Sequence, residues 1–537
     1  MNDAVRHTSV LIVGAGPSGL MMAAQLLRLG IQPMIIDAGD GPSNQSRAIA
    51  VHARSLEIYR QLGLAERAIK AGAIAERIVI HRGIKENAQA DLIGIGDGQS
   101  LFPYVLMLDQ SKNERLLLSY LTENACPVSW NTNLFELRQD HLSVQVKINK
   151  NGQEESWSAQ WLIGADGAES TVRKKLNISL KGGAYKHQFY VADLKLNQDL
   201  GNAIRLFPEE DGFVACFPMK PEGLYRFIGV LPESLRNNQD IGFDEIRPYL
   251  TFSLDFPLQI EQCKWFATYK LHYRMAERFN VQRCFLIGDA AHLHSPVGGQ
   301  GMNTGLQDAY NLAWKLAGVV QGVYNYTILN SYSEERMPVA RRLFATTDRL
   351  FSVLVSSNWF IRKFRKHWLP KILSQLCENE NTQHSIFKRL SQTGISYRNS
   401  SLSIHYSQIK RFKAGDRLPF MTLFDEKKEE LSDLHTWCGN PGFTLLVIGN
   451  LRERDVFTLA KWIKLSYPRG LNFYFLPPSP RNQQIFDLFE VKAKGNKAII
   501  VRPDLHIGYM NDVVDIAMID MYLKKIVGWD NKSILSS

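Results

Sequence analysis

Short apolar runs that end at glycine or at an acid recur along the chain and predict buried parallel strands. Ser9 to Val13 runs directly into a glycine-rich turn, and Leu20 to Leu29 then continues with a helical pattern. A second apolar run, Gln32 to Ile36, ends at Asp37. Continuous apolar runs between turn residues are typical of strands buried on both faces, and strands that alternate with helices form parallel sheets. The start of the chain therefore predicts a β-α-β unit.

A hairpin in the middle of the chain leads into a second strand end of this kind. Ser143 to Ile148 and Glu155 to Ile163 are predicted strands with a tight turn at Asn151-Gly152. The second strand runs into GADGAESTVR, residues 164–173, which places Asp166 directly after a strand.

A third strand end lies further along. Cys284 to Ile287 is a short apolar run, and Gly288 and Asp289 follow it. A loop with three glycines then leads into an amphipathic pattern that continues to Leu316. An acid at a strand end, followed by a glycine-rich turn into a helix N-terminus, is where an α/β protein holds an anionic or polar cofactor.

The glycine spacing at the start of the chain has a physical reason. Gly14 allows the tight turn, Gly16 lets the backbone approach a pyrophosphate, and Gly19 lets helix and strand pack closely. Asp37 follows at about the distance at which an acid reaches a ribose hydroxyl. A lone GxGxxG is a weak signal, but strand, glycines, helix, second strand and acid together predict a dinucleotide site.

Three polar residues near this unit have alternative roles. Arg47 and Arg54 flank a segment that turns helical at Ser55, and either arginine could meet a pyrophosphate in a bidentate contact. Equally, one or both could pair with Glu57 or another carboxylate. Gln110 lies at a strand-to-helix junction, where a helix cap is the alternative to a cofactor contact.

Length and composition narrow the class of protein. With 537 residues the chain is too long for one ordinary core, so two or three domains are expected. We find no apolar run long enough to span a bilayer and no room for a signal peptide before the first strand, so we expect a cytoplasmic protein.

The six cysteines are scattered without CxxC or metal-ligand spacing, so we expect reduced thiols and no metal site. The net charge of +10 favours a small anionic ligand, since nucleic-acid-binding motifs are missing from the sequence.

The three strand ends together resemble the single-component, or class A, FAD-dependent aromatic hydroxylases, which share the para-hydroxybenzoate hydroxylase fold. The resemblance rests on GAGPSG at 14–19, GADG with Arg173 at 164–173, and GDAAHLHSPVGGQGMN at 288–303. It extends through Tyr332 to Pro338 and covers most of residues 8–340.

The resemblance implies an FAD site with NAD(P)H and O2 as co-substrates. The glycine turn would bind the ADP half, Asp37 the ribose, Arg47 the pyrophosphate, and Gln110 the central part of FAD. Asp289 would bind the ribityl chain, the loop from Pro296 to Asn303 would lie along the flavin ring, and Asp166 would serve both nucleotides. The implied cofactor residues are Gly14, Gly16, Pro17, Ser18, Gly19, Asp37, Arg47, Gln110, Asp166, Asp289, Pro296, Gly299, Gly301, Met302 and Asn303. For His292, His294 and Met302 ordinary loop or core roles are the alternative.

Strand-like runs between Gly182 and Tyr273 predict an antiparallel sheet, which by resemblance is the substrate-binding layer over one face of the flavin. Its aromatic residues are candidates for the substrate wall or for ordinary core: Phe213, Phe217, Tyr225, Phe227, Phe266 and Tyr269. We name Tyr225, His272 and Tyr273 as catalytic candidates, and for each a structural role is the alternative. Family members that hydroxylate simple phenols carry an acid just before the arginine matched by Arg54, and Ile49 stands at that position here.

The expected fold class is α/β: a Rossmann-like FAD-binding domain with an inserted antiparallel-sheet substrate domain, plus a C-terminal thioredoxin-like α/β domain. The expected boundaries are 1–181 and 275–345 for the FAD-binding domain, 182–274 for the substrate domain, 346–400 for a helical linker and 401–537 for the C-terminal domain. The last domain resembles that of phenol hydroxylase and polyketide hydroxylases, but residues 450–453 read NLRE where a redox thioredoxin has CxxC. A structural or dimerisation role is therefore expected.

The basic, aromatic segment from Asn358 to Leu376 has two interpretations. It could lie on an acidic membrane surface, but an amphipathic linker helix kinked at Pro370 is the favoured one.

The leading functional hypothesis is an FAD monooxygenase that hydroxylates a phenolic or polyketide-like aromatic compound through a flavin C4a-hydroperoxide. A flavin reductase, epoxidase or halogenase on the same fold is an alternative, although the WxWxIP motif expected of a halogenase is missing from the sequence. A catalytically inactive FAD-binding scaffold protein is the alternative outside enzymes.

Overall fold

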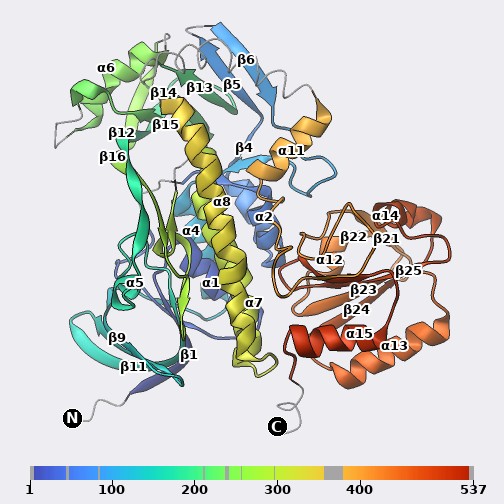
Figure 1. Cartoon of the computed structure of the whole chain (residues 1–537). Helices are drawn as coiled ribbons and strands as arrows, with labels where there is room; N and C mark the ends of the chain where they lie inside the picture. Colours follow the sequence, from blue (N-terminus) through green and yellow to red (C-terminus); the bar gives the residue numbers. More distant parts are fainter. Residues whose placement is uncertain are drawn as a thin grey trace.

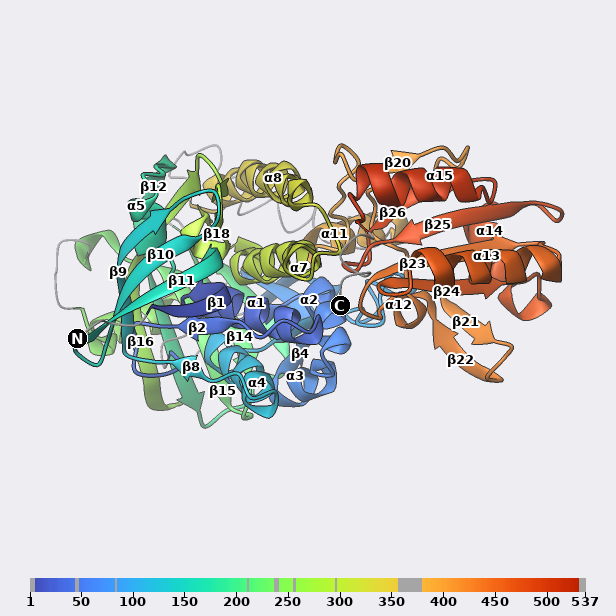
Figure 2. The same cartoon turned by 90° about the horizontal axis from the view of Figure 1, so that it is seen from below.

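The computed structural model describes residues 5–43, 48–82, 85–209, 212–235, 241–254, 257–294, 297–355 and 379–530. Arg47, Pro296 and the basic segment from Asn358 to Leu376 therefore lie outside the described residues. Figures 1 and 2 show two bodies side by side, the first two thirds of the chain and the C-terminal domain.

A parallel sheet forms the centre of the N-terminal domain. β1 (Arg6–Val13) lies between β2 (Met34–Ile36) and β11 (Gln153–Gly164), and β18 (Cys284–Leu286) pairs with the far side of β11. The apolar strands are buried because α1 (Pro17–Arg28), α4 (Gln110–Glu123) and α7 (Gln300–Val320) lie against them. These elements confirm the predicted β-α-β unit and the third strand end.

The predicted hairpin in the middle of the chain is also present. β10 (Val144–Lys150) pairs antiparallel with β11 and with β9 (Thr132–Gln139). Asn151 and Gly152 make the turn with φ of 50° and 88°, the left-handed geometry that a tight hairpin requires.

The second sheet has eight strands and stands above the first in Figure 1. Its order is β19-β16-β12-β15-β14-β13-β5-β6, in which β19 is the short strand His292–Leu293. The long strands β12 (Leu180–Leu196) and β16 (Ile260–Ala276) run from the N-terminal domain into this sheet. The predicted antiparallel sheet is confirmed by these two strands with β14 (Phe213–Met219) and β15 (Leu224–Val230).

The second sheet also contains strands that the sequence analysis did not predict. β5 (Arg77–Arg82) pairs parallel with β13 (Ala203–Pro208), and β6 (Lys85–Asp91) extends the edge. The sequence of β6, KENAQAD, is polar, which is common in an edge strand because it needs little apolar content. β5 and β13 are more apolar but only six residues long each. α6 (Phe243–Leu254) covers one face of the sheet.

The C-terminal domain is built on a five-stranded sheet of order β20-β26-β25-β23-β24. α13 (Glu453–Ser466) and α15 (Ile516–Met521) cover one face, and α12 (Leu434–Trp437) and α14 (Gln483–Leu488) the other. The strands are β20 (Ile404–His405), β23 (Phe443–Gly449), β24 (Leu471–Leu476), β25 (Asn496–Val501) and β26 (Ile507–Asn511). The stretch 498–509 is thus a hairpin. The order from β23 onwards is βαβαββα, so α14 adds a helix to the βαββα order that the sequence led us to expect. Residues 450–452 join β23 to α13.

Candidate functional site

Four strand ends meet at one edge of the first sheet. β18, β11, β1 and β2 are neighbours in that order, and their carboxyl ends carry Asp289, Asp166, Gly14 and Asp37. The chain crosses to opposite sides of β1 to reach β2 and β11, so the crevice at this edge is a topological switch point. The three sequence motifs, far apart in the chain, are therefore parts of one site.

The glycine turn packs so tightly that side chains are excluded at two positions. Gly14 has a φ of 106°, and a Cβ there would lie 2.3 Å from the carbonyl oxygen of Ala165. A Cβ at Gly19 would lie 1.9 Å from the carbonyl oxygen of Gly14. These contacts agree with the roles expected for the first and third glycines.

Gly16 is different, since it faces open space. No atom of the described residues lies within 4 Å of a Cβ built at Gly16. Gly16 is also the N-cap of α1, and no side chain of the described residues caps this helix end. Open space beside uncapped helix N–H groups is suited to a pyrophosphate, so the residues present fit the expected cofactor.

Ser18 connects the glycine turn to the Gly-Asp motif. Built Cβ atoms at Gly288 and at Gly305 would each lie 2.3 Å from the Ser18 hydroxyl oxygen. Gly288 has a φ of 59°, and the short 3-10 turn Gly288–Ala290 leaves Asp289 exposed at the surface. An exposed acid beside an uncapped helix end is available to a polar cofactor.

Asp37 braces the glycine turn with both carboxylate oxygens. It accepts hydrogen bonds from the N–H of Ala15 at 2.6 Å and from the N–H of Gly39 at 2.7 Å. The side chain is half-buried, and a carboxylate offers about four acceptor positions. Asp37 can therefore position the turn and still accept from a ribose.

Asp166 is held by the helix that follows it. Its carboxylate accepts from the Ser170 hydroxyl and from the N–H of Val172 at 3.0 Å. Burial raises the pKa of Asp166, although these hydrogen bonds oppose the shift. Arg173 donates to the carbonyl oxygens of Ala168 and Ala290, so it ties the second strand end to the third.

The glycine loop after Asp289 is held by Asn303. Gly298 and Gly299 have φ of 78° and 62°, and α7 begins directly afterwards. The Asn303 amide donates to the carbonyl oxygens of Ala50 and Gly299 and accepts from the N–H of His52 and the hydroxyl of Ser55. All its hydrogen-bonding positions are used, so the Asn303 side chain shapes the loop. Gly301 faces open space among the described residues, and Met302 accepts a weak bond from Asn113.

The contacts of Arg54 and Gln110 bear on their alternative roles. Arg54 is fully buried and pairs at 3.0 Å with Glu57, the carboxylate that the sequence offered as its alternative partner. The cap of α4 is Asp109, which accepts from the N–H of Lys112, and Gln110 is the first helical residue. The Gln110 amide donates to Glu114 at 2.9 Å.

Glu114 is a site residue that the sequence analysis missed. It is 2% exposed and accepts from the N–H of Ser43 as well as from Gln110. Burial raises the pKa of Glu114. Its hydrogen bond from Ser43 holds the segment that leads towards Arg47. An acid within the apolar run of a predicted helix is the signal that points to such a residue.

The aromatic residues of the second sheet divide between its two faces because side chains alternate along a strand. Tyr225, Phe227 and Phe266 pack in the cluster that α6 covers. Phe213, Phe217 and Tyr269 gather with Phe189 on the other face. Phe217 also packs against the core cluster that contains the N-terminal domain, so this second group lies on the face turned towards that domain.

The three catalytic candidates have structural contacts. Tyr225 donates to Asp199 at 2.6 Å and accepts from the N–H of Leu200, on the α6 side of the sheet. His272 and Tyr273 lie in the part of β16 that pairs with Ala184 and Gly183 of β12. The Tyr273 ring packs on Tyr185 with centroids 5.1 Å apart.

Arg226 was also missed by sequence reasoning. It is fully buried beside Tyr225 but on the opposite face, and it forms a bidentate pair with Asp193 at 2.7 Å. A third nitrogen donates to the carbonyl oxygen of Ala48, so Arg226 links the second sheet to the start of β3 (Ala50–Val51). Ile49, which stands where phenol-hydroxylating relatives are expected to carry an acid, is 5% exposed.

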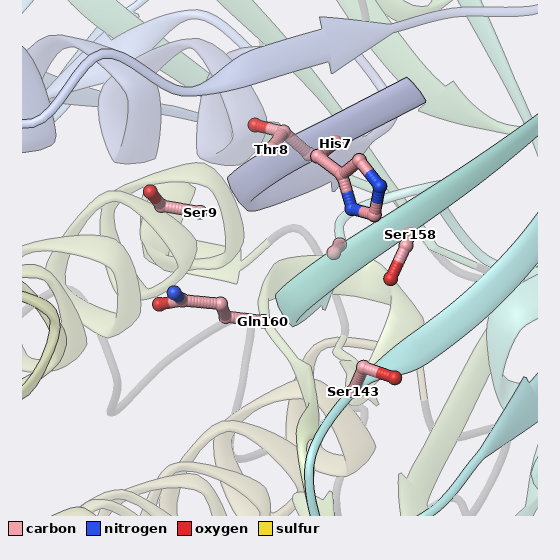
Figure 3. Close-up of a pocket in the computed structure, with 7 residues that line it drawn as sticks. His7, Thr8, Ser9, Ser143, Ser158 and Gln160 are labelled. Atoms are coloured by element: carbon pink, nitrogen blue, oxygen red, sulfur yellow. The ribbon is translucent and has the colours of Figure 1, made fainter. Parts of the chain in front are cut away.

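Two hollows lie outside this site. One, of about 270 Å³, is lined mainly by polar residues of β1, β10 and β11, among them His7, Ser143 and Ser158, and is drawn in Figure 3. It lies near the amino end of β1, opposite the edge that carries the motifs. The other, of about 460 Å³, lies between the two bodies beside Trp314 and Gly442. Among the described residues no cluster of metal-ligating side chains and no helix long and apolar enough to cross a membrane is found.

Comparison with known proteins identifies the class. The family model described as "FAD binding domain" matches residues 7–347. The chain belongs to this family and, by fold and motifs, to the class A FAD-dependent aromatic hydroxylases. It is a flavoprotein monooxygenase, as the three converging motifs led us to expect.

Individual relatives cover both the site and the C-terminal domain. The chain is 33% identical over 402 residues to a 6-methylpretetramide 4-monooxygenase of Streptomyces rimosus, covering 73% of this chain and 71% of the relative. It is 30% identical over 507 residues to an uncharacterized aromatic compound monooxygenase of Bacillus subtilis, covering 94% of each chain. The structure of aklavinone-11 hydroxylase with FAD and aklavinone superposes with a TM-score of 0.80 at 21% identity, covering 98% of this chain and 100% of that one.

Proposed function

We propose that this monooxygenase uses NAD(P)H and O2 to hydroxylate an electron-rich ring of a phenolic or polyketide-like compound. The observation that carries the proposal is the convergence of an open Gly16, an uncapped helix end and an exposed Asp289 at one edge. An apolar aromatic wall lies on the face of the second sheet that is turned towards the N-terminal domain. Such a combination suits a large cofactor with an anionic middle and a reacting end that must be kept dry.

We propose that the strand-end residues hold FAD in the order that the motifs imply. Gly16 and the first turn of α1 bind the pyrophosphate, Asp37 the ribose of the ADP half, and Asp289 the ribityl chain. The loop from Gly299 to Met302 then supports the ring system. The N-terminus of α7 lies in this loop and stabilises negative charge on a reduced flavin.

When bound and reduced by the nicotinamide co-substrate, FAD supplies the activation of O2. The protein binds and orients the substrate and excludes water. We propose that Phe189, Phe213, Phe217 and Tyr269 form the wall that does so. Water must be excluded because it diverts activated oxygen to hydrogen peroxide before the substrate reacts.

We assign no protein base for the substrate. The Tyr225 hydroxyl donates to Asp199. The buried Ile49 stands at the position, shortly before Arg54, where an acid would be expected. A substrate whose ring is already electron-rich, such as a polyphenol, needs less help from a base. Two similar proteins, a 6-methylpretetramide 4-monooxygenase and aklavinone-11 hydroxylase in complex with aklavinone, support a polycyclic compound of this kind.

We further propose the boundaries 1–181 and 275–345 for the FAD-binding domain, 182–274 for the substrate domain, 346–400 for the linker and 401–537 for the C-terminal domain. For the C-terminal domain we propose a structural role, with a homodimer as an alternative. The unpaired cysteines of the described residues, Cys126, Cys216, Cys263, Cys284 and Cys438, support the proposal that the enzyme works in the reducing cytoplasm.

The test is a substrate screen with the purified holoenzyme. We expect a yellow protein whose NAD(P)H oxidation is accelerated by a particular compound in a panel of phenols and aromatic polyketides. The product should carry an oxygen atom from isotopically labelled O2, and parallel runs with NADH and NADPH identify the co-substrate.

Three results would contradict the proposal. A folded but colourless protein that cannot rebind FAD would refute the cofactor site. A yellow protein that gains no oxygen in any product would favour a flavin reductase or an inactive scaffold, and an epoxide product would favour the epoxidase alternative.

A further inference from the structure

A buried carboxylate, Asp308, holds the turn that carries Asp289 from both sides. Asp308 lies in α7 and is fully buried. One oxygen accepts from the N–H of Gly288 at 3.1 Å and lies 2.6 Å from Nε2 of His292, while the other accepts from Arg336 at 2.7 Å. Gly288 precedes Asp289 and His292 follows it by three residues, so one side chain fixes both ends of the turn.

Arg336 extends this contact towards the C-terminal domain. It lies in α8 (Asn330–Val355) and is fully buried. Besides Asp308, it donates to the Tyr397 hydroxyl at 3.0 Å and to the carbonyl oxygen of Thr304 at 3.1 Å. Three different segments are thus joined by one guanidinium.

Tyr397 is anchored in the C-terminal domain. Its N–H donates to the carbonyl oxygen of Gly415 at 2.7 Å, and its ring stacks on His506 with centroids 4.4 Å apart. The guanidinium of Arg502, in the turn between β25 and β26, lies over the same ring at 5.4 Å. A shift of the C-terminal domain therefore moves the hydroxyl that Arg336 uses.

Gln392 makes a second connection, to the first turn of α7. It is 5% exposed and has a φ of 60°, a conformation that residues with a side chain rarely adopt. Its amide donates to the hydroxyl of Thr304 at 2.9 Å and to the carbonyl oxygen of Gln300 at 3.4 Å, and it accepts from Gln307. These contacts hold the backbone in the disfavoured conformation and fix the helix end that follows the glycine loop.

We propose that Asp308 is a positioning residue for the Gly288-Asp289 turn. We further propose that Tyr397, bonded to the C-terminal domain, and Gln392, in the segment that leads to it, make FAD binding depend on the docking of that segment and domain. The inference rests on the proposed function, in which Asp289 and the glycine loop hold FAD. The C-terminal domain lacks the CxxC of a redox thioredoxin, yet through these contacts it acts on the flavin site. Its role is to keep the cofactor-binding turn and loop in one arrangement.

The test compares FAD dissociation constants of the full chain and its variants well below their unfolding temperatures. Tyr397→Phe removes one hydroxyl and keeps the ring on His506, and Gln392→Ala removes the second connection. Each should weaken FAD binding by roughly fivefold, the effect of one net hydrogen bond. Asp308→Asn should weaken it further and move the reduction potential of bound FAD to a more positive value, because a nearby negative charge is lost.

A matched control removes a different contact between the same two domains. Arg60 of α2 (Ala53–Gln61) pairs with Asp433 of the C-terminal domain at 2.7 Å. Arg60→Ala should leave the FAD dissociation constant unchanged. A purely structural role would lower the stability of every variant without changing the FAD constant of the folded protein.

Asp289→Ala, measured in the same assay, separates the two proposals. If FAD binding survives Asp289→Ala unchanged, the proposed cofactor site is wrong. If Asp289→Ala weakens binding while Tyr397→Phe and Gln392→Ala bind FAD as the wild type does, the inference about the C-terminal domain is overturned. These two variants keep the test decisive even if Asp308→Asn does not fold.

Discussion

Gly19 lies against the carbonyl oxygen of Gly14, where a Cβ would stand 1.9 Å from that oxygen. The same turn leaves Gly16 in open space. The first contact is part of the folded protein, whereas the proposed function places the cofactor in the space beside Gly16. Two alanine substitutions in one turn should therefore have opposite consequences.

Gly16→Ala should leave stability nearly unchanged and weaken FAD binding by more than roughly tenfold, because its methyl group occupies the space of the pyrophosphate. Gly16 has a φ of −71°, which alanine adopts without strain. Gly19→Ala should instead lower the free energy of unfolding by roughly 2 kcal/mol or more, since backbone atoms must move apart. Urea unfolding of the apoprotein and FAD titration measure the two effects. A Gly16→Ala protein that binds FAD normally would place the pyrophosphate elsewhere.

Asp289→Ala should weaken FAD retention by roughly tenfold or more, since hydrogen bonds to charged groups contribute more than neutral ones. The side chain is exposed, so the substitution should cost little stability. Fluorescence of released flavin after dilution measures the retention. Asp140→Ala, which alters another exposed acid on the turn between β9 and β10, is the control and should retain FAD like the wild type.

Asp308 should make stability depend on pH in the acid range. Burial alone would raise its pKa, but the charges of His292 and Arg336 outweigh burial and lower the pKa from 3.8 to about 2. A lowered pKa in the folded state means that the stabilisation is complete above about pH 4 and is lost as the pH falls towards 2. We expect a contribution of roughly 2 kcal/mol.

Because other buried acids also titrate, the measurement is a difference. Urea unfolding measures the free energy of unfolding of the wild type and of Asp308→Asn. The difference between the two proteins should be smaller at about pH 2.5 than at about pH 5. A difference of the same size at both pH values would show that the Asp308 pKa is not lowered.

The two faces of the second sheet should respond differently to truncation. Phe217→Ala should raise KM for the aromatic substrate and increase the hydrogen peroxide released per NAD(P)H consumed, since the wall then admits water. Phe227→Ala, on the face under α6, should lower stability by roughly 3 kcal/mol and leave that ratio near the wild-type value. The reverse pattern would place the substrate on the α6 side.

Tyr225→Phe should behave as a structural change. It removes the hydrogen bonds with Asp199 and Leu200 and should cost about 1 kcal/mol of stability. The rate of hydroxylation at saturating substrate should stay within roughly twofold of the wild type. A large loss of the hydroxylation rate in a stably folded protein would show that Tyr225 takes part in catalysis.

Local patterns in the sequence determined most of the elements and predicted the candidate cofactor residues. Glycine spacing, apolar runs and terminal acids act over a few residues, so Gly14, Gly16, Gly19, Asp37 and Asp289 could be named directly. Parallel strands end at the same edge of a sheet, which is why acids at several strand ends predicted one site.

Tertiary structure decided the roles that depend on a distant partner. Arg54 pairs with Glu57. The Asn303 side chain forms hydrogen bonds within the glycine loop and its surroundings, and Tyr225 lies on the α6 side of the sheet. Period-2 alternation separates the two faces of a strand, but only the positions of α6 and the first sheet show which face is turned towards the N-terminal domain. The same holds for Asp308 and Tyr397, because the contacts they share through Arg336 exist only once remote segments are brought together in the fold.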